Sequence, residues 1–176
     1  MSNSPHRSFE KIEKADLSRV SELARECLDD MLARKDTGRY YSSDRVLMAC
    51  LCQGAARHFV HGDHGVHDWD VVFFFRTNLN REFPPRWRGK RDFGPSRFGA
   101  NPDDGPKYSG RRIDVLGRDI PAPSGISAEQ AIIAYLKKSA KGSSAHYWAK
   151  RPLIALTPQD MLGRIIWDGA ARSGLA

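Results

Sequence analysis

The segment that decides the fold runs from Gln53 to Phe75 and reads QGAARHFVHGDHGVHDWDVVFFF. Its last five residues, from Val71 onward, are apolar and either β-branched or aromatic, which predicts a buried β-strand. Two acids, Asp68 and Asp70, stand at the start of this strand with one aromatic residue between them. Because side chains alternate along a strand, we expect the two carboxylates to point the same way, about 7 Å apart.

A third acid, Asp114, lies in the short β-favouring run from Arg111 to Leu116, with an apolar residue on each side. A charge in such a run is costly to bury unless something pairs with it. If this strand lies beside the first, Asp114 joins Asp68 and Asp70, and hard carboxylate oxygens so arranged suit Mg²⁺ or Mn²⁺. The alternative for each acid is a solvated carboxylate at the edge of a sheet.

The residues before this strand supply a second motif. The run Val46–Cys52 is apolar, and Gly54 follows it with two alanines, small residues that let a backbone turn approach a phosphate closely. We predict that Val46–Cys52 is the first core strand. It could instead be helical and continue as far as Val60, because periodicity does not separate the two for a short apolar run.

The order of these motifs resembles the nucleotidyltransferase superfamily, the DNA polymerase β-like fold in its minimal form, over residues 44 to 120. By that resemblance Gly54 takes the phosphate-loop position, Asp68 and Asp70 bind the metal pair, and Asp114 is the third carboxylate, which helps to activate the attacking group. The chain departs from the family pattern in two respects. Ala55 replaces the usual second glycine or serine, and a long insertion delays the third strand.

The resemblance implies transfer of a nucleoside monophosphate from an NTP such as ATP to a hydroxyl of a nucleic acid, a protein or a small molecule. Gln53, Gly54 and Arg57 would face the phosphates. Short stand-alone enzymes of this family also resemble the toxin partner of bacterial toxin–antitoxin pairs. A non-catalytic nucleic-acid- or protein-binding module on the same scaffold is one alternative. A metal-dependent nuclease is another, but it predicts a nearby lysine, and none is close in sequence to Asp70 or Asp114.

Histidines recur at every third position of the segment between the glycine motif and the acids. They are His58, His61, His64 and His67. A structural zinc site would need at least three of them to converge. The segment passes from a helix into a loop with two glycines, so this spacing does not keep one face. We therefore predict that His67, and also His64, line the nucleotide pocket.

The insertion from Arg76 to Arg112 holds ten Lys or Arg residues against four acids. Its proline and glycine residues exclude long regular elements. Aromatic residues stand between the basic ones: Phe83, Trp87, Phe93, Phe98 and Tyr108. This pattern suits phosphate contact and base stacking, most densely in Arg86–Arg91. The alternative is a solvated loop whose aromatic side chains pack on the core.

The length of 176 residues suits a single domain with an N-terminal helical part (1–43), a core (44–120) and a C-terminal helical part (121–176). We expect an α/β (α+β) fold with a small mixed sheet between these helical parts. The net charge of +7 favours an anionic partner. Three cysteines in apolar patterns indicate reduced thiols in the cytoplasm, and no apolar run approaches membrane-spanning length.

The flanking segments carry helix signals. Apolar spacing predicts a helix from Asp16 to Lys35, and a capping box at Ser127 opens a second helix that ends near Gly142. A short apolar run, Leu153 to Leu156, predicts a further strand. A last helix is expected to begin at Pro158 and to turn inward a set of five side chains: Met161, Leu162, Ile165, Ile166 and Trp167.

Overall fold

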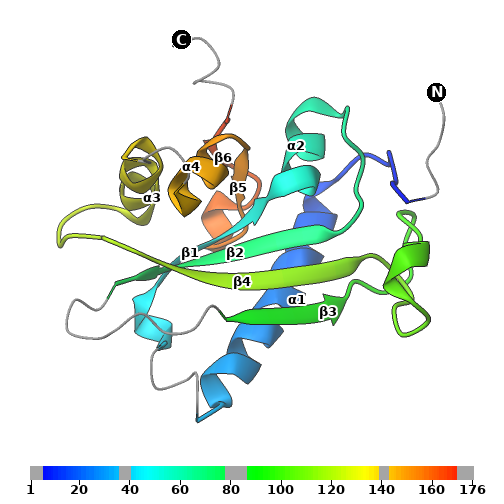
Figure 1. Ribbon diagram of the computed structural model, residues 1–176, viewed down its shortest axis with the longest axis horizontal. Helices are drawn as coiled ribbons and strands as arrows, with labels where there is room; N and C mark the ends of the chain where they lie inside the picture. The colour runs from blue at the N-terminus through cyan, green and yellow to red at the C-terminus, as the bar shows by residue number, and fades with distance from the viewer. Residues whose placement is uncertain (1–5, 36–40, 78–86, 139–142, 170–176) are drawn as a thin grey trace.

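A six-stranded mixed sheet forms the centre of the protein (Figure 1). The computed structural model describes residues 6–35, 41–77, 87–138 and 143–169. The strands lie in the order β3-β4-β2-β1-β5-β6, where β2 and β4 are parallel and all other neighbours are antiparallel. Their bounds are β1 Val46–Cys52, β2 Trp69–Arg76, β3 Arg88–Asp92, β4 Arg112–Ile120, β5 Leu153–Ala155 and β6 Ile165–Trp167. With helices on both faces, this is the expected α+β class.

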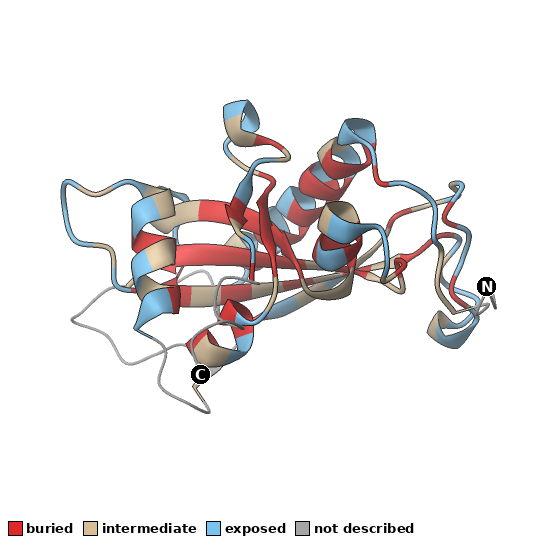
Figure 2. Ribbon diagram, turned by 90° about the horizontal axis from the view of Figure 1, so that it is seen from above, coloured by how far each residue is buried: buried red, intermediate tan, exposed pale blue. Residues whose placement is uncertain are grey.

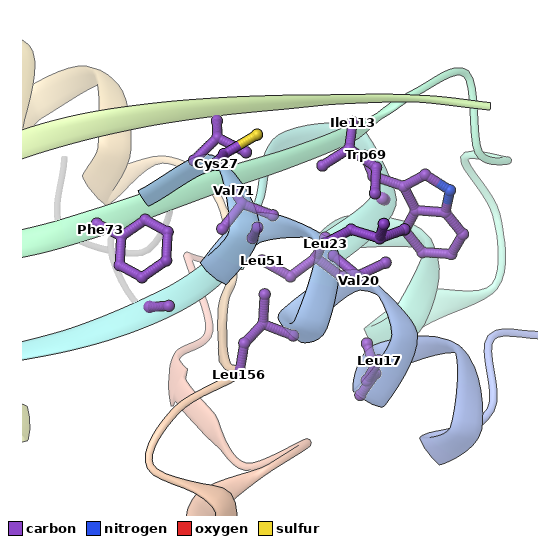
Figure 3. Close-up of a cluster of buried hydrophobic side chains, with 14 of the residues drawn as sticks. Leu17, Val20, Leu23, Cys27, Leu51, Trp69, Val71, Phe73, Ile113 and Leu156 are labelled. Carbon is purple, nitrogen blue, oxygen red and sulfur yellow. The ribbon is translucent and has the colours of Figure 1, made fainter. Parts of the chain in front are cut away.

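One face of the sheet packs on α1 (Lys14–Ala33), whose apolar stripe meets the side chains of the central strands. Figure 3 shows Leu17, Val20 and Leu23 of this helix beside Leu51 and Trp69 of the sheet. The helix begins two residues earlier than predicted because Glu13 is its N-cap and Asp16 completes the capping box. Burial of this stripe holds the helix against the sheet.

The opposite face is covered in part by α3 (Ala128–Lys137) and α4 (Ser144–Ala149), which pack on the alternate side chains of β1 and β2. The predicted capping box at Ser127 is present, with the side chain of Gln130 as its other half. Figure 2 shows the central strands buried along most of their length between these layers. The three cysteines are free and buried, two of them in β1.

The short helix α2 (Gln53–His61) follows β1 without a loop and ends at Gly62, whose φ of 71° provides the left-handed C-cap. This confirms that Val46–Cys52 is a strand and that a helix separates it from the acids. The helical alternative for Val46–Cys52 is wrong, since the run pairs with β2 and β5.

The C-terminal part is less helical than predicted. Residues Gln159–Met161 form only a 3₁₀ turn, and Ile165–Trp167 is strand β6, paired with β5. Gly163, with φ of 86°, reverses the chain between them. Ile165 is 46% exposed whereas Ile166 is 5% exposed, which is the alternation of a strand. The strand predicted at Leu153 is confirmed as β5, and the predicted end of α3 near Gly142 lies outside the described residues.

The long insertion contains a strand that its composition did not predict. Strand β3 pairs with β4, and Trp87, Phe93 and Phe98 are buried beside it. For these three residues the packing alternative holds, because Phe93 stacks on Trp69 at 5.2 Å and Phe98 meets the same ring edge-on at 5.0 Å. The part of the insertion that includes Phe83 and Arg86 lies outside the described residues.

In the described part of the chain, no helix has both the length and the apolar character that crossing a bilayer requires.

We predict that Trp69→Ala lowers the free energy of unfolding by about 3–5 kcal/mol, because a fully buried indole and its stacked neighbours lose their contacts. Ile165→Ala removes an exposed side chain from the edge strand and should cost about 0.5 kcal/mol or less. Urea denaturation followed by circular dichroism measures both. Equal losses in the two variants would contradict this packing.

Candidate metal centre and adjoining pocket

Three acids meet at one edge of the sheet. Asp68 immediately precedes β2, Asp70 is the second residue of β2, and Asp114 is the third residue of β4. The parallel register places Asp70 directly beside Asp114. One carboxylate oxygen from each acid lies within 4.8 Å of the others, so the structure brings together the three acids that the sequence singled out.

Trp69 fixes the orientation of its two acidic neighbours. Its side chain is fully buried on the α1 face between Phe93 and Phe98. Since alternate residues of a strand face opposite ways, an anchored Trp69 turns Asp68 and Asp70 to the other face. The aromatic residue between the acids therefore belongs to the core, and the acids it separates belong to the site.

The acids are electrostatically crowded. Burial, and then the negative charges of Asp68 and Asp114, raise the pKa of Asp70 from its ordinary value to about 7. Arg112 and Arg151 oppose this shift but do not cancel it. A bound cation would relieve both the desolvation and the mutual repulsion of these carboxylates.

Arg112 is the resident counter-ion of this cluster. It precedes Asp114 by two residues and so lies on the same face of β4. Its guanidinium donates to Asp114 Oδ2 at 2.9 Å and to Asp68 Oδ2 at 3.2 Å. It also donates to Asp104, whose side chain is only 2% exposed and whose Oδ2 has no partner among the described residues. One guanidinium thus serves three carboxylates. The sequence analysis missed both Arg112 and Asp104.

Two of the four histidines, His58 and His67, lie in different surroundings. His58 is buried, where its Nδ1 accepts the Gly65 N–H at 3.1 Å and its Nε2 lies 3.1 Å from the Glu10 carbonyl oxygen, so it has a structural role. His67 lies beside the acids, with Nδ1 3.6 Å from Asp68 Oδ1 and Nε2 3.2 Å from Asn101 Nδ2. Among the described residues, the three acids form the only cluster with metal-binding geometry, and no histidine belongs to it.

A pocket of about 480 Å³ opens beside the start of α2. Its lining includes Gln53, Gly54 and Arg57, which the sequence predicted to face phosphates, and also His64. His67 is not among the lining residues. The C-terminal part contributes two cations to the lining, Lys150 and Arg151, and no sequence motif predicted either of them. Arg57 is exposed and forms a salt bridge to Asp63 at 2.9 Å, so its charge is shared within the lining.

The turn between β1 and α2 has a constrained geometry. Gln53 has φ of 56°, an uncommon conformation for a residue other than glycine. Its Oε1 accepts the Tyr147 hydroxyl at 2.9 Å and Arg151 Nη1 at 2.6 Å. A Cβ at Gly54 would lie 3.0 Å from the His64 ring, which accounts for glycine there. Glycine at position 54 therefore allows the His64 ring to lie close to the backbone of this turn.

The pocket and the acids adjoin each other. Cys52, the last residue of β1, pairs with Asp70 across the sheet, and Gln53 follows it directly. Arg151 lies close enough to lower the pKa of Asp70. Gln53, which lines the pocket, is therefore one residue away in sequence from the register partner of Asp70.

A lysine also lies beside the acids, contrary to the sequence-based expectation. The antiparallel register of β3 and β4 places Lys90 directly opposite Asp114. Lys90 and Asp114 are distant in sequence but adjacent in the folded chain. The lack of a lysine near the acids in the sequence is therefore no argument against the nuclease alternative.

Comparisons with protein-family models, with curated proteins and with solved structures find no match to this chain.

We predict that Asp70→Asn melts at a higher temperature than the wild type at about pH 8 in the presence of a chelator. The folded-state pKa of Asp70 is raised from 3.8 to about 7, so the folded state loses stability as the pH rises through this interval. The advantage of the variant should disappear near pH 4, where Asp70 is protonated in the wild type. Thermal melts across this range measure the difference.

Asp29→Asn, at an exposed position on α1, is the matched control. It should track the wild type at every pH. An Asp70→Asn melting temperature that falls below that of the wild type at about pH 8 would contradict the electrostatic crowding of the acids.

Proposed function

We propose that this chain is a metal-dependent nucleotidyltransferase, which moves a nucleoside monophosphate from an NTP to an acceptor hydroxyl. The observation that carries the proposal is the convergence of Asp68, Asp70 and Asp114 within 4.8 Å of one another beside a pocket whose lining holds three cations and two acids. Neither part alone would suffice, since acids also cluster as solvated groups and cations also line ordinary clefts.

The donor set fits a small, hard divalent cation. Three carboxylates supply oxygen ligands, and the single Arg112 guanidinium is shared among Asp68, Asp114 and Asp104. Mg²⁺ or Mn²⁺ held there by Asp68, Asp70 and Asp114 would neutralise the triphosphate and orient it for in-line displacement.

The pocket fits the polyphosphate of the donor. Lys150 and Arg151 supply positive charge, and Gln53 already orients the Arg151 guanidinium by accepting its Nη1. The α2 helix begins at the pocket lining, where the N-terminal end of its dipole favours an anion.

The layout across the sheet would keep donor and acceptor apart. Cys52, Asp70, Asp114 and Lys90 form one transverse row from β1 to β3. The pocket adjoins the β1 end, so the acceptor approaches from the β3 end, where Asp114 lies. Its hydroxyl oxygen forms the new bond to the α-phosphorus, the bond from the α-phosphorus to the bridging oxygen breaks, and pyrophosphate leaves. Asp114 accepts the hydroxyl proton.

A metal-dependent nuclease is the second candidate, and Lys90 is the observation that favours it. A nuclease would use the same acids to direct water at a phosphodiester and has no need of the pocket. A non-catalytic binding module, alone or as part of a toxin–antitoxin pair, needs neither the metal nor the NTP. Nucleotide binding therefore separates the three functions.

We predict metal-dependent binding of at least one NTP, measured by calorimetry with Mg²⁺ or Mn²⁺, and its loss in Asp68→Asn/Asp70→Asn. The double variant removes two oxygen ligands and leaves the fold of β2 in place. Asp29→Asn/Asp160→Asn removes the same charge from exposed positions outside the site and should bind like the wild type. Absence of NTP binding to the wild type would overturn the transferase function.

We predict that Arg151→Gln weakens NTP binding about tenfold or more, because a charge-assisted hydrogen bond to phosphate is lost. Binding of Mn²⁺ alone should persist, since Arg151 donates to no acid of the cluster. Arg164→Gln, which removes an exposed cation paired with Glu129, is the control. Unchanged NTP affinity in Arg151→Gln would exclude this pocket as the triphosphate site.

A further inference from the structure

The sheet face that carries the acids is left open over β3 and β4 by the described helices. The α1 helix lies behind both strands in Figure 1, which looks onto the open face. Alternate residues of β3 confirm the direction. Arg91 forms salt bridges to Asp30 and Glu26 of α1, and a Cβ at Gly89 would meet Cys27 of the same helix. Arg88 and Lys90, which alternate with Gly89 and Arg91 along β3, therefore face away from α1.

On the opposite side of the same strands, α3 reaches the sheet where β4 ends. Tyr135 of α3 meets Phe74 edge-on, and Phe74 is the register partner of Arg118. The open face thus extends along β4 from the acids to the edge of α3, with β3 as its outer border.

Three basic side chains lie on this open face. Arg88 and Lys90 are exposed on β3, where they pair in register with Leu116 and Asp114. Because cross-strand partners share a face, both project on the side of the acids. Arg118 lies on the same face of β4, four residues beyond Asp114. We call these three residues the basic strip.

The basic strip lacks ion-pair partners among the described residues, although the positive charge of Arg118 acts on nearby Asp119 and Tyr135. None of its members forms a salt bridge to a described residue, and Arg118 Nε is buried without a hydrogen-bond partner in the same part of the chain. By contrast, Arg91 and Arg112 on these two strands are both paired with acids. Unpaired cations on a solvent-facing surface are the usual anchors for phosphate groups.

The geometry of the basic strip selects a linear polyanion. It starts at Lys90 beside Asp114 and runs along β4 for about 13 Å to Arg118, at 3.3 Å per residue. Two neighbouring strands lie about 4.8 Å apart, so the strip has the width of one backbone. A strand of nucleic acid meets both requirements, because it repeats a phosphate along its length and ends in a hydroxyl.

We propose that the acceptor is a single-stranded nucleic acid, whose phosphodiester backbone lies on Arg88, Lys90 and Arg118 and whose terminal hydroxyl reaches Asp114. Transfer of a nucleotide to that hydroxyl rests on the proposed transferase function. Binding of the strand does not, because the basic strip holds the backbone without NTP or metal.

The test is the salt dependence of binding. A fluorescein-labelled single-stranded RNA and a DNA of the same sequence are titrated with protein in EDTA at several salt concentrations. In Arg88→Gln/Lys90→Gln/Arg118→Gln, the slope of log K against log salt should become shallower by about 2, since each phosphate contact on a single strand contributes about 0.7. Comparing the two probes shows which polymer is preferred.

Lys11→Gln/Lys14→Gln/Arg25→Gln is the matched control, because it removes the same charge from exposed positions on and beside α1, behind the sheet. Its slope should equal that of the wild type. Arg88→Gln/Lys90→Gln keeps the partly buried Arg118, so it guards against unfolding, and it should reduce the slope by about 1.4. Equal slopes in the strip variants and the wild type would overturn the proposal, as would an equal loss in the control.

Two further arms separate the rival outcomes. Polyglutamate that binds as tightly as RNA, and through the same three residues, would replace the nucleic acid by an acidic protein and overturn the proposal. Asp68→Asn/Asp70→Asn should still bind RNA, and more tightly, because two charges that repel phosphate are gone. If RNA binding depends on the basic strip while no NTP binds, the surface stands and the transferase function falls.

Discussion

The convergence of three partly buried carboxylates at one edge of the sheet is the constraint on which the rest of the site depends. Parallel pairing of β2 with β4 sets Asp70 beside Asp114, and the buried Trp69 turns Asp68 to the same side. Like charges this close repel each other unless cations lie among them. Arg112 meets part of that need through its hydrogen bonds to Asp68 and Asp114. Burial, together with the remaining repulsion from Asp68 and Asp114, raises the pKa of Asp70.

The transverse row from β1 to β3 organises the surface around these acids. At the β1 end, the turn at Gln53 connects the row to a pocket with Lys150 and Arg151 in its lining. At the β3 end, Lys90 begins the basic strip. Positive charge therefore flanks a negative centre on both sides. Such an arrangement suits two phosphate-bearing ligands that meet at a divalent cation, since each is attracted to its own flank and neither is attracted to the bare acids.

Sequence reasoning succeeded where local pattern determines structure. The apolar, β-branched and aromatic run Val71–Phe75 predicted a buried strand, and alternation then predicted the shared face of Asp68 and Asp70. Asp114 followed from the same logic. The nucleotidyltransferase type of the sheet, in contrast, stays a proposal, because strand order and three converging acids are compatible with more than one function.

The rest depended on contacts between distant residues. Strand β3 reads Arg-Gly-Lys-Arg-Asp and forms because β4 offers it an edge, which no periodicity in β3 reveals. Ile165–Trp167 has apolar residues that a helix could also use, and pairing with β5 made it a strand. Arg151 lines the pocket but lies far along the chain from Gln53 and the acids, so no local pattern pointed to it. Arg112 was the one omission that a local rule could have prevented, since it shares a strand face with Asp114.

The most direct measurement of the central claim is an anomalous difference map from crystals grown with Mn²⁺ and a non-hydrolysable NTP analogue. The account predicts a peak among the carboxylates of Asp68, Asp70 and Asp114, with oxygens at about 2.1 Å, and phosphates in the pocket beside Gly54. A map without a peak there, in which the Arg112 guanidinium still bridges Asp68 and Asp114, would contradict it. The acids would then form a closed structural ion cluster.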